Sequence, residues 1–94
     1  MGGSLLGACG SGSAGTVPKA PAGDPELVLG QSVFADHCAR CHGSSGRGGA
    51  GPRLAGEEID VDVVRSGRRG MPAFGSKLDD QQLEAAAAYV AAVL

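Results

Sequence analysis

Two cysteines and a histidine stand within five consecutive residues, Cys38-Ala39-Arg40-Cys41-His42, and constrain this chain more than any other feature. Thiols three positions apart project from one side of a helix end, and the next residue places an imidazole beside them. This spacing allows two thioether bonds to the vinyl groups of one haem, with the imidazole below the iron. The motif therefore predicts one covalently bound haem c, held by Cys38 and Cys41, with His42 as an iron ligand.

Two other kinds of site use closely spaced cysteines. A structural zinc ion needs four ligands in a tetrahedron, whereas the cysteines and histidines within residues 37–42 are too crowded in sequence for all of them to face one ion. A thioredoxin-like redox pair needs a strand–helix–strand context, and no stretch of this sequence predicts one. We therefore favour haem over both.

The chain is short of material for a hydrophobic core. It has 94 residues, 17 of them glycine, with two phenylalanines, one tyrosine and no tryptophan. Domains this small usually need a metal, disulfides or a cofactor, and the odd number of cysteines, three, excludes a framework made of disulfides alone. The net charge of -2 excludes a polybasic nucleic-acid binder. No stretch has the ~20 apolar residues of a membrane-spanning helix.

The spacing of apolar residues predicts an all-α domain over residues 26–94, with long loops around one haem. The helices are expected over residues 25–41, 60–66 and 80–94. Asp60 or Asp62 can cap the second helix, and Asp79 with Gln82 resembles a capping box for the third. No segment alternates for long enough to predict a strand.

Residues 1–25 differ in composition, being rich in Gly, Pro, Ser and Ala, which predicts a flexible tether. Within it, Leu6-Gly7-Ala8-Cys9 resembles a bacterial lipobox, in which the cysteine carries lipid. An export signal needs a basic segment and a longer apolar run before that site. Either the true start of the protein lies upstream, or Cys9 is a chance linker cysteine.

The haem iron needs a sixth ligand or keeps an open site. His37 directly precedes Cys38 and cannot reach the far face of the ring, so we expect it to be exposed or packed. Met71 is followed by Pro72 and lies in a glycine-rich loop rather than on a helical face. A lone methionine is usually core filler, but beside a haem motif this placement favours Met71 as the distal iron ligand.

In sum these residues resemble a class I monohaem c-type cytochrome of the small bacterial kind. The matching residues are, in order, 38–42, 51–54, 67, 71–74, 83 and 89–90. The resemblance implies that the carbonyl of Pro52 holds the imidazole of His42. It also implies that Gly30 lets the first and last helices cross closely, with Tyr89 filling the crossing; the alternative is that Gly30 is a spacer near a helix start.

A haem with histidine and methionine on its two faces has no open position, which favours electron transfer over oxygen chemistry. We therefore expect a one-electron carrier and not an enzyme, with a positive potential because a thioether stabilises Fe(II). If Met71 does not bind the iron, the alternative is a haem-based sensor or a haem subunit of a larger oxidoreductase.

Every arginine lies between Arg40 and Arg69, where the resemblance places the haem edge. These arginines either form a basic rim that docks an acidic redox partner or are ordinary solvated side chains. Arg53 likewise either contacts a haem propionate or is a solvated loop residue. Because this family attaches haem outside the cytoplasm, we expect an extracytoplasmic monomer, held at the membrane if Cys9 carries lipid.

Overall fold

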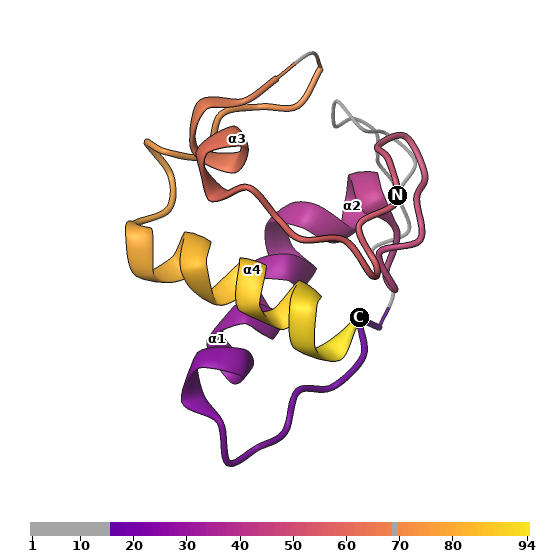
Figure 1. Cartoon of the computed structure of the whole chain (residues 1–94), viewed down its shortest axis with the longest axis vertical. Helices are drawn as coiled ribbons and strands as arrows, with labels where there is room; N and C mark the ends of the chain where they lie inside the picture. The colour runs from indigo at the N-terminus through magenta and orange to yellow at the C-terminus, as the bar shows by residue number, and fades with distance from the viewer. Residues whose placement is uncertain (1–15, 69) are drawn as a thin grey trace, which may run out of the picture.

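The computed structural model describes residues 16–68 and 70–94 and is built from helices (Figure 1). The elements are α1 (Pro25–Val33), the π-helical segment η1 (Phe34–Cys38), α2 (Ala39–His42), α3 (Val61–Ser66) and α4 (Asp80–Val93). Among these described residues, extended pairing is limited to one bridge between Arg68 and Met71, and no helix has the length and apolar character needed to cross a membrane. The prediction of an all-α fold is confirmed.

Local capping signals decide where the later helices begin and end. Asp60, and not Asp62, caps α3, because its Oδ1 accepts the backbone N–H of Asp62 at 2.9 Å. Gly67 follows the last turn of α3 with a φ of 81°, as expected for a glycine after a helix. The capping box of α4 is present in full, with bonds of 2.8 and 2.9 Å between Asp79 and Gln82.

The elements α1, η1 and α2 form one continuous rod, close to the predicted helix over residues 25–41, but its middle turn is wider than an α-helix. The N–H of Ala39 donates to the carbonyl of Phe34, five residues back. One extra residue in this turn rotates everything after it by about 100° around the helix axis. The wide turn therefore decides which way Cys41 and His42 face.

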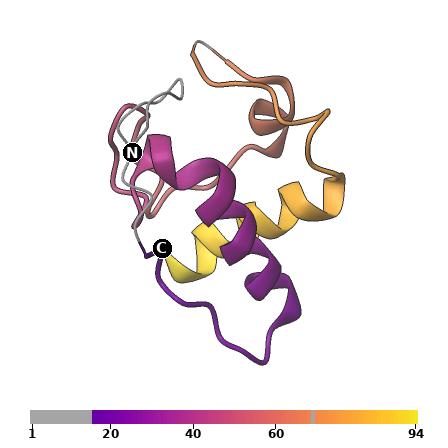
Figure 2. The ribbon, with the colours of Figure 1, turned by 180° about the vertical axis from the view of Figure 1, so that it is seen from behind.

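The rod and α4 cross each other (Figures 1 and 2), and at Gly30 the crossing leaves no space for a side chain. A Cβ atom added to Gly30 would lie 2.0 Å from the carbonyl oxygen of Ala85 and 2.7 Å from the Cβ of Tyr89. Tyr89 is fully buried, and its ring packs against Phe34 with 5.5 Å between centroids. Gly30 is thus a crossing residue and not a spacer.

Replacing Gly30 by alanine should strongly destabilise the domain. The two helices would have to separate, and overpacking typically costs about 1–3 kcal/mol or more, of which the better helix propensity of alanine offsets at most ~1 kcal/mol. Because the added Cβ would meet backbone, we expect the upper typical cost less this offset, about 2 kcal/mol, which lowers Tm by roughly 8–16 °C. The control is Gly23→Ala, since no atom lies within 4 Å of a Cβ there. Equal melting of the two variants would contradict the crossing.

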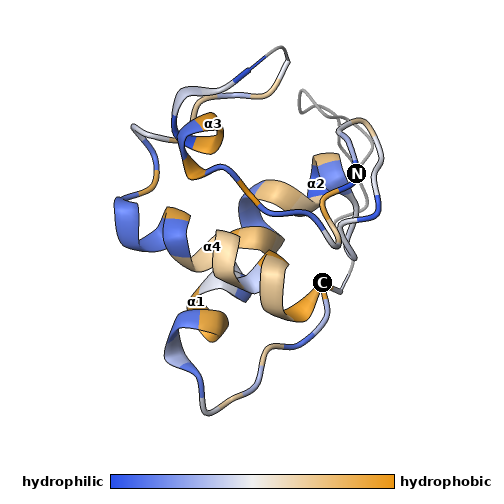
Figure 3. Cartoon of the chain, in the orientation of Figure 1, coloured by the Kyte–Doolittle hydropathy of each residue, from blue (hydrophilic) through white to orange (hydrophobic). Residues whose placement is uncertain are grey.

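The core divides into two apolar clusters on either side of this crossing. The first centres on Phe34, Tyr89 and Val90, and the second on Phe74 and Leu83. Figure 3 shows the polar first turn of α4 giving way to an apolar remainder, which covers the rod. The second cluster joins Val33, the last residue of α1, to Phe74 and Met71, which places the loop after α3 beside the end of α1.

Residues 16–24 pack against the helices, which corrects the prediction of a tether over residues 1–25. Val17 is buried in the first cluster, the hydroxyl of Tyr89 donates to the carbonyl of Pro18, and the N–H of Ala20 donates to Oε1 of Gln31 at 2.7 Å. The tether prediction is therefore wrong for this part of the segment. The lipobox-like run and Cys9 lie outside the described residues.

Candidate functional site

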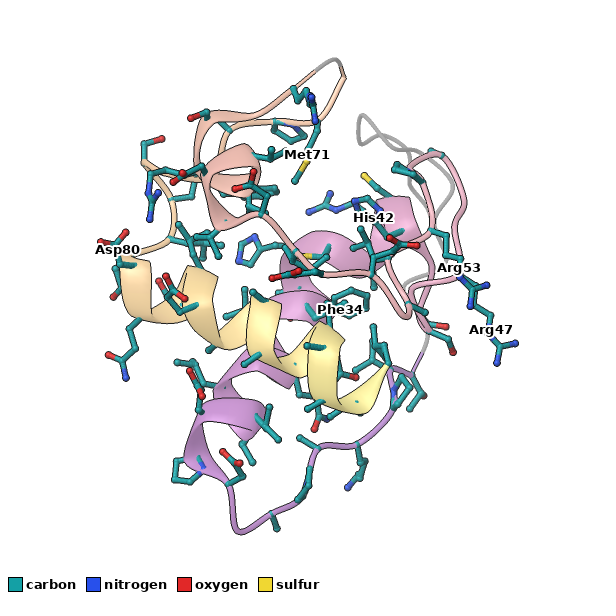
Figure 4. All side chains as sticks on the ribbon, viewed as in Figure 1. Phe34, His42, Arg47, Arg53, Met71 and Asp80 are labelled. Atoms are coloured by element: carbon teal, nitrogen blue, oxygen red, sulfur yellow. The ribbon has the colours of Figure 1, made fainter. Side chains whose placement is uncertain are left out.

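A cavity opens between α2 and the loop that follows α3, and it brings together the two segments that carry the predicted haem ligands. It is lined by His37, Cys38, Arg40, Cys41, His42, Met71, Pro72, Phe74 and Lys77. Figure 4 shows His42 on the α2 side and Met71 reaching in from the loop on the other side. The two cysteines, the imidazole and the thioether therefore face one space.

The imidazole of His42 is fixed by the backbone of the loop that follows it. Its Nδ1 donates to the carbonyl oxygen of Pro52 at 2.6 Å, which is the contact that the family resemblance implies. Because a carbonyl only accepts, Nδ1 carries a proton, and in the neutral imidazole the lone pair is then on Nε2. The side chain is 7% exposed. This arrangement leaves His42 ready to coordinate a metal through Nε2.

The glycines of the loop over residues 43–56 allow its backbone to lie against this imidazole. A Cβ on Gly51 would come within 3.0 Å of Cε1 and 3.1 Å of Nδ1 of His42. The N–H groups of Gly48 and Gly51 donate to the carbonyls of His42 and Cys41, at 2.8 and 2.7 Å. The glycine content of this loop thus has a local reason, which is to clamp the end of α2.

Cys38 is half-buried and has a free thiol. Burial raises the pKa of its thiol to about 11, whereas redox-active pairs lower the thiol pKa. The described residues also lack the strands of a thioredoxin-like site. In the part of the chain that the structure describes, no group of three His, Cys, Asp or Glu side chains could hold a metal ion. Both alternatives to haem lose their support here.

Met71 lies in a tight hairpin that is bonded to the end of α3. Arg68 and Met71 exchange two backbone hydrogen bonds of 3.1 and 2.8 Å, and the N–H of Phe74 donates to the carbonyl of Val64 at 3.0 Å. The side chain of Met71 is half-buried and packs against the second apolar cluster. Its loop therefore has a defined position across the cavity from His42.

Comparison with known proteins gives the family of this site. The model of the family described as cytochrome c oxidase, cbb3-type, subunit III matches residues 25–90. The chain belongs to this family of c-type cytochromes. The match begins at the first residue of α1 and includes both cavity-lining segments, so this cytochrome domain coincides with the helical part of the fold.

Individual relatives of this c-type cytochrome differ in length, and this chain covers different shares of them. The cbb3-type cytochrome c oxidase subunit CcoP of Helicobacter pylori is 35% identical over 83 residues, which cover 77% of this chain but 29% of that protein. Cytochrome c6 of a Synechococcus strain is 31% identical over 74% of this chain and 72% of its own. Cytochrome CL of Methylophaga aminisulfidivorans shares the fold, with a TM-score of 0.64 at 23% identity over 73% of this chain and 53% of that one.

The cytochrome carries a covalently bound c-type haem with iron and takes part in haem-based electron transfer. The cavity fits this group by its donor set. Cys38 contributes a free thiol, Cys41 lines the same cavity, and His42 presents an imidazole whose Nδ1 is bonded to Pro52. When bound, the haem supplies a one-electron couple, while the protein orients the imidazole and surrounds the ring.

Arg53 does not line this cavity, and its predicted contact with a haem propionate stays a prediction. Its Nε donates to the carbonyl of Ala55 at 3.1 Å, and Figure 4 shows its side chain directed away from Met71, on the same side as Arg47. Two other cations, Arg40 and Lys77, line the cavity instead. Arg40 stands inside the cysteine motif and could have been chosen from the sequence, whereas Lys77 reaches the cavity only through the path of the loop.

The predicted basic rim is reduced by pairing within the protein. Arg65 binds Asp62 at 2.6 Å and Asp80 at 3.0 Å, and the hydrogen bond to Asp80 is the main cause that raises the pKa of Arg65. The charge of Arg65 is therefore neutralised by two carboxylates outside the cavity lining.

His37, which we expected to be exposed or packed, packs edge-on against Phe74, with 5.8 Å between ring centroids. Arg69 lies outside the described residues.

Proposed function

We propose that His42 and Met71 bind the haem iron from opposite faces and that this cytochrome is a one-electron carrier. The observation that carries the proposal is the pair of side chains on either side of one cavity. His42 has its Nδ1 bonded to Pro52 and its Nε2 available, and Met71 is the thioether across from it. In this arrangement Cys38 and Cys41 attach the haem edge, and Pro52 is a positioning residue for the imidazole.

Two axial protein ligands favour electron transfer because neither face of the iron is left for oxygen or peroxide. The thioether is a soft ligand, which stabilises Fe(II) and raises the potential. Phe74 and Pro72 add apolar surface to the Met71 side of the cavity. An apolar surrounding keeps water away from the haem, so fewer water molecules have to reorient when the charge of the iron changes.

The ferric spectrum of haem-loaded protein tests this proposal. A methionine-ligated ferric haem c has a weak charge-transfer band at the red end of the visible spectrum, and an open site lacks it. We expect that band, together with a redox titration that follows one electron, about 59 mV per tenfold change in oxidation ratio. A spectrum without the band, with rapid binding of carbon monoxide to the ferrous form, would instead favour a sensor or a catalytic haem.

A second function is favoured by the relatives rather than by the cavity. This chain spans 29% of the length of the oxidase subunit CcoP that it matches, so the same domain serves there as one part of a larger protein. We propose as the alternative that this cytochrome is a haem subunit or domain that passes electrons within an oxidoreductase complex. Co-purification of a stable complex from the native source would support it over a free monomeric carrier.

The cations beside the cavity support an acidic redox partner. Arg40 and Lys77 line the cavity and are exposed at its mouth. Two cations at the edge of an otherwise acidic protein would attract a negatively charged surface and orient it toward the haem. Of the arginines in the predicted rim, Arg40 lines the cavity and Arg65 is paired with Asp62 and Asp80.

We also propose that the protein works outside the cytoplasm and that Cys9 carries lipid. The support is the lipobox-like run before Cys9 and the extracytoplasmic attachment of haem in this family. Two or more acyl chains anchor a protein stably, whereas one binds weakly. Expressed from its natural gene, the protein should fractionate with membranes, and Cys9→Ser should release it. A wholly soluble protein with an unmodified Cys9 thiol by mass spectrometry would contradict the anchor.

A further inference from the structure

The loop that carries Met71 and helix α3 form one hydrogen-bonded unit. The N–H groups of Phe74 and Gly75 donate to the carbonyls of Val64 and Arg65, each at 3.0 Å. A Cβ on Gly67 would lie 2.9 Å from the carbonyl oxygen of Met71, so the chain turns back on itself without a gap. The loop is thus bonded to α3 through Phe74 and Gly75, three and four residues after Met71, so a movement of α3 would carry this end of the loop with it.

One side chain joins this unit to α4. Arg65 donates through Nη1 to Asp62 at 2.6 Å, within α3, and through Nη2 to Asp80 at 3.0 Å, in the first turn of α4. Its aliphatic part lies against the loop, since a Cβ on Gly75 would be 2.8 Å from Cγ of Arg65. Arg65 thus contacts α3, the Met71 loop and α4 at once. Figure 4 shows Asp80 at the start of α4, on the far side of α3 from His42.

We propose that the ion pair between Arg65 and Asp80 is a positioning contact that keeps the Met71 loop closed over the haem. The inference rests on the proposed binding of iron by Met71. Apolar packing of the second cluster also holds the unit against α4, so the ion pair is an addition to that packing. The pair between Arg65 and Asp62 stays within one helix and cannot restrain the loop in this way.

The size of the effect follows from exposure. The side chains of Arg65 and Asp80 are 38% and 80% exposed, and exposed ion pairs are weak and screened by salt. Loss of the pair should therefore raise the rate of loop opening by only about two- to fivefold. Such a change is too small to unfold the protein but is well within the range of a ligand-binding rate measurement.

Imidazole binding to the haem-loaded ferric protein measures loop opening, because the incoming ligand must wait for the methionine to leave. At about pH 8.5 imidazole is mostly uncharged, so salt does not change its approach. We expect Asp80→Asn to bind imidazole about two- to fivefold faster than wild type and Asp62→Asn to bind at the wild-type rate. At about 1 M salt the difference between Asp80→Asn and wild type should disappear.

A second pair of variants separates the contact from a general effect of charge at the start of α4. Arg65→Gln should also speed binding, and adding Asp80→Asn to it should change nothing further, since the pair is already broken. Equal rates for wild type and Asp80→Asn, or additive effects of the two substitutions, would overturn the proposal. If wild type itself lacks the far-red band and binds imidazole at once, Met71 is not a ligand and the proposed function is wrong as well.

Discussion

Replacing both Cys38 and Cys41 by serine is expected to give a protein whose haem is lost on denaturation. Each thioether is a covalent bond between one of these sulfur atoms and the porphyrin edge, so the variant can hold haem only through axial ligands and packing. Intact mass spectrometry after expression in a host that attaches haem should show wild type at the mass of polypeptide plus one haem. The double variant should appear at the mass of the polypeptide alone.

The third cysteine provides the matched control for this experiment. Cys9→Ser should keep the haem mass, because the motif for attachment lies in residues 38–42. We also expect the double variant to lose helix content, since a domain with so little core material depends on its bound group. A wild-type protein at the bare polypeptide mass, or a double variant that keeps covalent haem, would contradict the assignment of both cysteines.

Features held by contacts between near neighbours in sequence could be predicted. The capping box of Asp79 and Gln82 spans three residues, and the cysteine motif presents its groups from one helix end. The contact between His42 and Pro52 was implied by resemblance, and its two residues are ten positions apart. In the first two cases the residue types and their spacing already contain the geometry.

Apart from the crossing of Gly30 and Tyr89, which the resemblance implied, features that depend on distant partners were not predicted. The hydroxyl of Tyr89 binds Pro18, 71 residues away, and nothing in the composition of residues 16–24 indicates that they pack. Arg53 was assigned two roles with equal justification, because a side chain with several donors takes whichever acceptor the loop brings close, here Ala55. The wide turn η1 was also not predicted from the sequence.

Replacing Met71 by alanine is expected to open one face of the iron and to lower the reduction potential. A thioether stabilises Fe(II), so its loss should move the potential down by on the order of 0.1 V or more, within the ~0.8 V range that axial ligands control. The far-red band of the ferric form should vanish. Cyanide should bind the ferric form, and carbon monoxide the ferrous form, without the delay that methionine dissociation causes in wild type.

Pro72→Ala is the control for this substitution, because it changes the neighbouring cavity-lining residue and leaves the thioether in place. It should keep the far-red band and most of the potential, which separates loss of the ligand from disturbance of the loop. Redox titration and stopped-flow ligand binding on both haem-loaded variants make the comparison. If Met71→Ala keeps the band, the potential and slow ligand binding, a different side chain holds the sixth position, and electron transfer through a His42–Met71 haem must be abandoned.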